Sequence, residues 1–204
     1  SGKTTFLNVL SQYIPAAERV ITIEDSLEIH YSEINPEADA VELRVGEDFS
    51  YTDAIKACLR QNPMWLVLSE ARSVEVTSLI EQWSTGVNGI TTIHLDDLRK
   101  LPDRIENMMN DVNDASRLEN RIYRYVNVGV LIRREKEADG GIRRYIDQMC
   151  FYVREEHKNR VYMLVEDGEI ISRKIPADIA KRLKLAGIDE FFWCDLDPFI
   201  KRGM

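Results

Sequence analysis

The chain begins Ser1-Gly2-Lys3-Thr4-Thr5, and this stretch decides how the rest of the sequence is interpreted. It matches the second half of the phosphate-binding loop G-x-x-x-x-G-K-[S/T], with the first glycine of that motif missing. In such a loop the glycine lets the backbone curl around an anion, and the N-terminus of the next helix adds its positive dipole end. Lys3 is then expected to reach the β- and γ-phosphates of a nucleotide, and the Thr4 hydroxyl to bind Mg²⁺.

The residues after this stretch support a loop that leads into a helix. Their apolar positions share one helical face, which we expect to be buried, and Pro15 would close the helix. These positions are Phe6, Leu7, Leu10, Tyr13 and Ile14. The predicted nucleotide-binding set is Ser1, Gly2, Lys3, Thr4 and Thr5. The alternative is a helix that begins with Ser-Gly-Lys by coincidence.

Length and composition bound the class of protein. The 204 residues are enough for one main domain and a smaller appended unit. A hydrophobic fraction of 44% and a charged fraction of 30% predict a soluble globular chain. A net charge of −8 argues against a large basic surface, so nucleic acid is disfavoured as a partner.

The cysteines and the first residue bear on location and completeness. Cys58, Cys150 and Cys194 are odd in number and far apart, so they predict neither a disulfide framework nor a zinc site. A reducing, cytoplasmic location fits them best. Because the chain starts inside a motif and without Met, we expect it to be a fragment of a longer protein.

Polar residues follow three short apolar runs that are predicted to be buried strands. Residues 19–23 precede a carboxylate cluster that ends with Glu28, residues 64–68 precede Glu70, and residues 89–94 carry His94. Ligands of open α/β sheets bind at the carboxyl ends of the strands. Glu70 could there hold Mg²⁺ through water or polarise an attacking water, and His94 could bind the γ-phosphate. The alternatives are a solvated acidic loop and a structural histidine.

Helices are predicted between these strands. Ser50 and Asp53 form a capping box that opens a helix ending before Pro63, with Cys58 as a small core residue. Further amphipathic helices are expected over residues 76–86 and 102–112. The alternation in residues 41–45 predicts a half-exposed edge strand.

From Tyr125 onward the pattern changes to strands alone. Strands are expected over residues 126–132, 142–153, 161–165 and 170–175, with hairpin turns at residues 139–141 and 167–168. Arginines 133, 134, 143 and 144 flank the first turn, either as a polyanion site or as a solvated hairpin end. Pro176 would open a last helix that buries Ile179 and Leu183 and is capped by Gly187. Aromatic residues 191–193 then require a surface to pack against.

The predicted fold is therefore α/β. Residues 1–124 form a phosphate-loop core with a largely parallel sheet, cut inside its loop. Residues 125–175 form an antiparallel extension, and residues 176–204 form the C-terminal helix and aromatic tail.

With these motifs in place, the chain resembles the ATPase superfamily of type II and type IV secretion, type IV pili and conjugation, particularly the tight-adherence pilus branch. The resemblance covers about residues 1 to 134 and rests on four motifs in the family's order. They are the truncated phosphate loop at residues 1–5, the acidic box Ile23-Glu24-Asp25-Ser26-Leu27-Glu28, the Walker-B segment Leu66-Val67-Leu68-Ser69-Glu70-Ala71-Arg72, and the histidine box at residues 85–94. Ser69 and Val87 depart from the glycine and histidine that are usual in the family.

The resemblance implies a RecA-like ATPase core and a role for each site residue. Glu28 looks like the catalytic carboxylate that orients water, Glu70 like the Walker-B acid, and His94 like the γ-phosphate sensor. Arg60 and Arg72 stand where the family places basic residues near the nucleotide or the subunit boundary. The sequence identifies no partner for either arginine within the chain.

The resemblance also implies cofactors, partners and location. It implies ATP with Mg²⁺, a homo-hexamer, and a motor for pilus assembly or for the export of protein or DNA. An inner-membrane platform protein would be the partner, with no direct contact to nucleic acid, and the protein would be cytoplasmic and peripheral to the inner membrane. The resemblance also implies an N-terminal domain that these 204 residues do not include, and because the phosphate loop is cut they are expected to be inactive alone. The alternatives are a nucleotide-binding regulatory or assembly module with little turnover and a RecA-like nucleic-acid motor.

Overall fold

The structure is a computed structural model that describes residues 2–108 and 115–188. These residues form two compact units. The first unit comprises residues 2–94 and 104–108, and the second comprises residues 95–103 and 115–188. No helix among the described residues is both long enough and apolar enough to cross a membrane.

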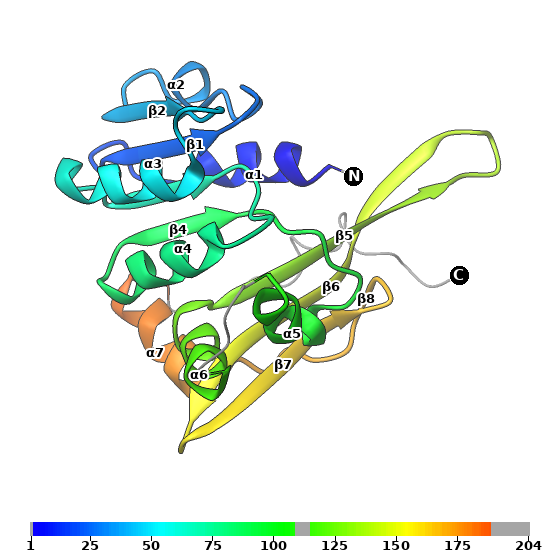
Figure 1. Ribbon diagram of the computed structural model, residues 1–204. Helices are drawn as coiled ribbons and strands as arrows, with labels where there is room; N and C mark the ends of the chain where they lie inside the picture. Colours follow the sequence, from blue (N-terminus) through cyan, green and yellow to red (C-terminus); the bar gives the residue numbers. More distant parts are fainter. Residues whose placement is uncertain (1, 109–114, 189–204) are drawn as a thin grey trace. The chain divides into compact units, whose positions relative to one another are not determined.

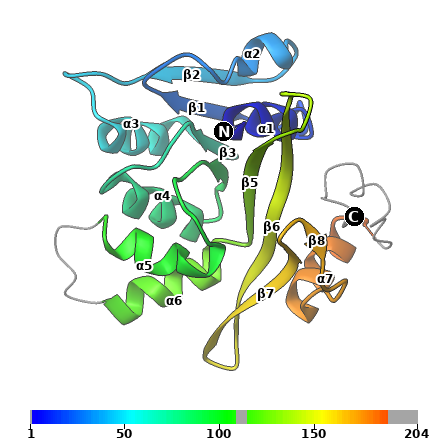
Figure 2. The same ribbon diagram turned by 90° about the vertical axis from the view of Figure 1, so that its right-hand side faces the viewer.

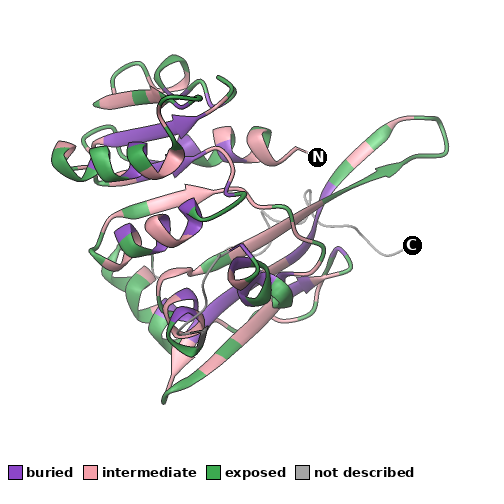
Figure 3. Cartoon of the chain, viewed as in Figure 1, coloured by how far each residue is buried: buried purple, intermediate pink, exposed green. Residues whose placement is uncertain are grey.

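The first unit is built on a four-stranded parallel sheet (Figure 1). Its strands are β1 (Val20–Glu24), β2 (Ala40–Arg44), β3 (Trp65–Leu68) and β4 (Asn88–Thr91), in the order β2-β1-β3-β4. β1 is buried at every position, and β2 is the predicted half-exposed edge strand (Figure 3). The parallel core predicted from the sequence is confirmed. The strand expected to reach His94 instead ends at Thr91.

Helices cover both faces of this sheet, as Figure 2 shows. They are α1 (Lys3–Ser11), α2 (Tyr31–Ile34), α3 (Tyr51–Cys58), the 3-10 turn η1 (Leu59–Gln61) and α4 (Glu75–Ser84). From α1 and its exit turn, Leu7 and Ile14 pack against Val20 and Val67. Since side chains alternate along a strand, the remaining residues of β1 and β3 point to the other face of the sheet, where α3 and α4 lie (Figure 2).

The predicted apolar face of α1 is partly wrong. Leu7 and Ile14 are buried, but Leu10 is 36% exposed and Tyr13 is 81% exposed. The physical reason is that α1 ends at Ser11, so Tyr13 lies in a turn and no longer follows the helical spacing.

The start of α3 is as predicted. The Ser50 hydroxyl accepts a hydrogen bond from the Asp53 N–H at 3.2 Å, and Asp53 accepts the Ser50 N–H in return. Cys58 is 1% exposed, which confirms it as a small core residue.

The second unit contains a four-stranded antiparallel sheet in the order β5-β6-β7-β8. Its strands are β5 (Val128–Lys136), β6 (Ile142–Glu155), β7 (Lys158–Glu166) and β8 (Glu169–Ile170). Its helices are η2 (Leu98–Lys100), α6 (Ala115–Tyr125) and α7 (Ala177–Leu185), while α5 (Leu101–Glu106) runs across the sequence boundary between the units. An apolar cluster of Phe151, Leu164 and Val165 is covered by Ile179 and Leu183 of α7.

Most predictions for this region are confirmed, with three corrections. The strand expected over residues 126–132 runs instead from Val128 to Lys136. Pro176 precedes α7, and Gly187 ends it with a left-handed φ of 80°. The strand expected over residues 170–175 stops at Ile170, because the backbone N–H groups of Ile171 and Ser172 both donate to the carbonyl of Leu164 and the chain leaves the ladder. The helix expected over residues 102–112 ends at Glu106. Met109, Val112 and the aromatic residues 191–193 lie outside the described residues.

Candidate functional site

The phosphate-loop residues lie at the start of α1. Gly2 adopts a left-handed conformation with φ 99° and ψ 7°, a region that favours glycine, and its carbonyl accepts the Phe6 N–H at 3.0 Å. In Figure 1 the arrows of β1 and β4 point toward the side of the unit at which α1 begins. The helix therefore presents its N-terminal end at the edge of the sheet where the strands finish. Ser1 lies outside the described residues, and Thr5 is exposed on α1.

Lys3, Glu70 and His94 meet at this edge. The Lys3 ammonium nitrogen lies 3.0 Å from Nε2 of His94 and 3.9 Å from Oε1 of Glu70. The same imidazole nitrogen lies 3.0 Å from Oε1 of Glu70. Three residues that are 24 or more positions apart in the sequence thus come together as predicted.

The electrostatics of Lys3 suit an anion-binding role. Its side chain is only 22% exposed, and this partial burial lowers the pKa of the Lys3 ammonium from its ordinary value. The negative charge of Glu70 raises the same pKa, and the positive charge of Arg72 lowers it further. A bound phosphate would supply negative charge close to a cation that is already partly removed from water.

Arg72 bridges two carboxylates of the same unit. Its guanidinium donates to Oε2 of Glu70 and to Oδ2 of Asp25, each at 2.9 Å. The hydrogen bond and charge of Glu70 raise the pKa of Arg72. The sequence identified no partner for Arg72 within the chain, and the structure supplies two. Arg72 therefore positions Glu70 in its own subunit.

Thr4 and Glu28 form the other side of the site. The Thr4 hydroxyl donates to Oε2 of Glu28 at 3.1 Å. One helical turn later, the Asn8 amide donates to the backbone carbonyl of Glu28 at 3.0 Å. Sequence reasoning missed Asn8, although its position four residues after Thr4 places both on one helix face and was a usable signal.

Glu24 anchors the loop that carries Glu28. It is 1% exposed at the end of β1, and its Oε2 accepts the backbone N–H groups of Glu28 at 2.7 Å and Ile29 at 3.1 Å. A buried carboxylate is tolerated when backbone donors satisfy it. The acidic box therefore contains one structural carboxylate beside those that face the site.

Arg60 is not brought to this cluster. It lies exposed on η1, and no hydrogen bond or ion pair joins it to another residue in the described part of the chain.

The donor set fits Mg²⁺ with few protein ligands. Within the described ranges no group of three or more His, Cys, Asp or Glu side chains is arranged to hold a metal. Mg²⁺ bound to nucleotide needs only one or two protein oxygens because it keeps several waters. The hydroxyl of Thr4 and the carboxylate of Glu70 are oxygen ligands of that kind.

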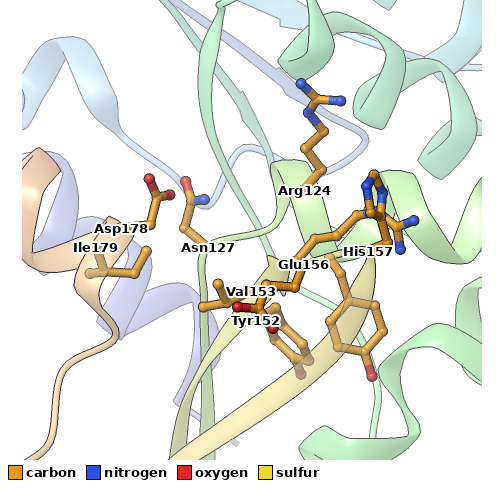
Figure 4. Close-up of a pocket in the computed structure, with 10 residues that line it drawn as sticks. Arg124, Asn127, Tyr152, Val153, Glu156, His157, Asp178 and Ile179 are labelled. Atoms are coloured by element: carbon orange, nitrogen blue, oxygen red, sulfur yellow. The ribbon is translucent and has the colours of Figure 1, made fainter.

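A separate hollow of about 380 Å³ occurs in the second unit (Figure 4). Tyr123 and Arg124 of α6, Asn127 before β5, His157 in the β6–β7 turn and Asp178 of α7 are among its lining residues. None of the predicted site residues lines it, so it is unrelated to the phosphate loop.

Comparisons with known proteins agree with this arrangement. The sequence profile described as "Type II/IV secretion system protein" matches residues 1–133. The uncharacterized protein pXO2-25 of Bacillus anthracis is 34% identical over 137 residues, which are 66% of this chain and 31% of that protein. The chain thus spans about a third of that relative's length.

Two solved structures share the fold. The VirB11 ATPase of the Brucella suis type IV secretion system, in complex with sulphate, is 25% identical with a TM-score of 0.62 over 74% of this chain and 45% of that chain. The pilus retraction motor PilT with bound ADP is 25% identical with a TM-score of 0.64 over 72% of this chain and 43% of that chain. Together with the profile match over most of the chain and the RecA-like core that carries its motifs, these likenesses establish that the chain belongs to the type II/IV secretion system protein family.

Proposed function

We propose that the protein, in a chain that carries a complete phosphate loop, hydrolyses ATP to drive pilus assembly or the export of protein or DNA. The observation that supports this most is the meeting of Lys3, Glu70 and His94 beside the start of α1. The names of VirB11, an ATPase of a secretion system, and PilT, a motor with bound ADP, favour the same chemistry.

Each side chain would have a positional or electrostatic task, since phosphoryl transfer depends mostly on these. Lys3 would bind the β- and γ-phosphates in place of its present contacts with His94 and Glu70. His94 would donate to the γ-phosphate, and Glu28 would orient the attacking water. Thr4 and Glu70 would hold Mg²⁺, which supplies neutralising charge on the phosphate oxygens when bound.

We propose that the working form is a homo-hexamer that is cytoplasmic, peripheral to the inner membrane and docked on a platform protein there. Arg60, exposed and unpaired within the described residues, could then serve a neighbouring subunit. The tight-adherence branch remains the most specific family assignment that the motifs support.

Variants of the site residues test the proposal in the full-length protein. Glu70→Gln should bind ATP but hydrolyse it about 10² to 10³ times more slowly, because a contact that tightens in the transition state is lost. Lys3→Ala should lose binding as well. Glu47→Gln changes an exposed acid in the same way and should match the wild type. Glu70→Gln with wild-type turnover would contradict the assignment.

The same assay separates the alternatives. Tight ATP binding by the wild type with negligible turnover would support a regulatory or assembly module. Turnover that requires single-stranded DNA or RNA would support a nucleic-acid motor, which the net charge of −8 disfavours.

A further inference from the structure

We propose that Tyr51 is a positioning residue that ties the two acidic strand ends of the site together, and that this link sets the orientation of Glu70 during turnover. The inference rests on the proposed ATPase function. Tyr51 belongs to none of the four motifs, and the sequence analysis assigned it no role.

The contact that carries the inference is made by a single hydroxyl group. The Tyr51 oxygen accepts the backbone N–H of Asp25 at 3.1 Å and lies 3.0 Å from Oγ of Ser69. Asp25 directly follows β1, and Ser69 directly follows β3. One oxygen atom of α3 therefore joins the carboxyl ends of two neighbouring strands.

These contacts form a closed circuit around Glu70. Asp25 holds Arg72 through its carboxylate at 2.9 Å, and Arg72 holds Glu70 at 2.9 Å. Glu70 follows Ser69 in the chain, and the Ser69 hydroxyl lies within hydrogen-bond distance of the Tyr51 hydroxyl, which closes the circuit. Glu70 is thus linked to Tyr51 along two paths, one through the Ser69 side chain and one through Arg72 and Asp25.

The other polar groups next to Glu70 are already fixed by the sheet. The Ser69 N–H donates to the Ile23 carbonyl at 3.0 Å, and the Ser69 carbonyl accepts the Thr92 hydroxyl at 2.6 Å. The Ala71 N–H donates to the Thr92 carbonyl at 2.8 Å. The strands thus hold the backbone of Ser69, whereas Tyr51, which belongs to α3, contacts its side-chain hydroxyl.

The chemistry of a tyrosine hydroxyl suits this task. Its oxygen can accept from Asp25 while its proton goes to Ser69, and the Ser69 proton then remains available for an acceptor in the site. Tyr51 stays neutral near pH 7, since burial raises the pKa of its hydroxyl. Phenylalanine would keep the ring in place and remove both hydrogen bonds.

Kinetics of the full-length protein test the link. Tyr51→Phe and Ser69→Ala should each lower kcat for ATP about tenfold while KM changes less than about twofold, because small misplacements near reacting groups cost rate more than binding. The double variant should be no slower than the slower single variant, since both changes remove the same bond. Ser69→Thr, which keeps a hydroxyl, should restore most of the rate.

A matched control separates this role from a general loss of tyrosine hydroxyls. Tyr162→Phe removes a hydroxyl that donates to Glu155 at 2.7 Å in the second unit, and it should leave kcat and the melting temperature unchanged. Wild-type kcat in Tyr51→Phe would overturn the inference. If Tyr51→Phe lowers the melting temperature, Ser69→Ala gives the deciding kinetic result.

Amide hydrogen exchange keeps the inference separate from the proposed function. If the wild type hydrolyses no ATP, the ATPase proposal fails, but the link is still measurable at the Asp25 amide. Exchange at Asp25 should be faster in Tyr51→Phe than in the wild type, because the acceptor of its N–H is lost. Exchange that is unchanged in Tyr51→Phe would overturn the link whatever the activity.

Discussion

The carboxylate of Glu24 accepts the backbone N–H of Glu28 at 2.7 Å, so the structural acid of the acidic box holds the acid that faces Thr4. Glu24 is the last residue of β1, and Glu28 lies in the short loop that follows it. The geometry of Glu28 therefore depends on a buried side chain that never touches the site.

We predict that Glu24→Gln lowers the free energy of unfolding by about 1–2 kcal/mol, because a neutral amide replaces a charge-assisted acceptor in a buried place. Urea unfolding measures the change. Glu42→Gln is the matched control, since Oε1 of the exposed Glu42 also accepts a backbone N–H, from Ser32 at 2.9 Å. It should cost less than about 0.5 kcal/mol. Equal costs for the two variants would show that burial of Glu24 does not matter.

A second prediction concerns Gly89 in β4. A Cβ at this position would lie 2.0 Å from Nε1 of Trp83 and 2.8 Å from the carbonyl oxygen of Leu66. Because the Leu66 carbonyl belongs to the backbone of β3 and cannot move without disturbing the sheet, Gly89→Ala should destabilise the protein by about 1–3 kcal/mol. Gly46→Ala is the control, because nothing lies within 4 Å of a Cβ there. Similar melting temperatures for the two variants would contradict the predicted clash.

A third prediction concerns Cys58 and the way in which the free energy of unfolding changes at alkaline pH. Burial raises the pKa of its thiol from 9.0 to about 11. Between these pH values the unfolded chain has lost the proton and the folded chain has kept it, so the contribution of the thiol to stability is complete below pH 9 and is lost as the pH rises to about 11. Cys58→Ala removes this loss. The difference in unfolding free energy between wild type and variant should therefore shift by up to about 2–3 kcal/mol, at about 1.4 kcal/mol for each pKa unit.

Urea unfolding of both proteins at several pH values gives this difference, and the titration of other groups cancels in it. A difference that stays constant through the alkaline range would mean that Cys58 ionises equally in both states.

The parallel core could be predicted because the signals for it are local. Apolar runs such as residues 64–68, capping residues such as Ser50 and the loop around Lys3 each act over a few positions. The end of a strand fixes where the next polar residue lies, so the sequence alone was enough to assign Glu70 and His94 to one edge of the sheet.

The contacts between side chains could not be predicted in the same way. Arg72 donates to Asp25, which is 47 positions away in the sequence, and Tyr51 contacts both Asp25 and Ser69. These contacts form because the sheet order brings β1 beside β3. The spacing of apolar residues in the sequence does not predict which side chains will form such hydrogen bonds. The same limit explains Tyr13, whose exposure depends on the residue at which α1 ends.

A fourth prediction is that turnover requires a ring. Arg60 makes no ion pair within the described residues, and an arginine supplied by a neighbouring subunit is worth about 10³-fold or more in other nucleotide hydrolases. Turnover per chain of the full-length protein should rise steeply with concentration as rings form. Arg60→Ala should lower the turnover of the assembled protein about 10³-fold, whereas Arg44→Ala, an exposed arginine on β2, should not. Specific activity that stays flat from dilute monomer to oligomer would refute the requirement.

The last prediction concerns these 204 residues by themselves. A phosphate loop encloses the β-phosphate with consecutive backbone amides held between a strand and a helix, and here only the half from Ser1 onward is present. Gly2, Lys3 and the dipole of α1 still attract an anion, and the dipole contributes about 0.3–1 kcal/mol. Micromolar affinity requires about 8 kcal/mol.

Residues 1–204 alone should therefore bind ATP with Mg²⁺ no better than about millimolar and should hydrolyse none, whereas a chain extended upstream through the whole loop should do both. Isothermal titration of the two chains side by side measures this, with Lys3→Ala in the longer chain as the control for binding through the loop. Micromolar binding by the shorter chain would place the nucleotide on other groups than the start of α1, because the missing amides could not then be essential.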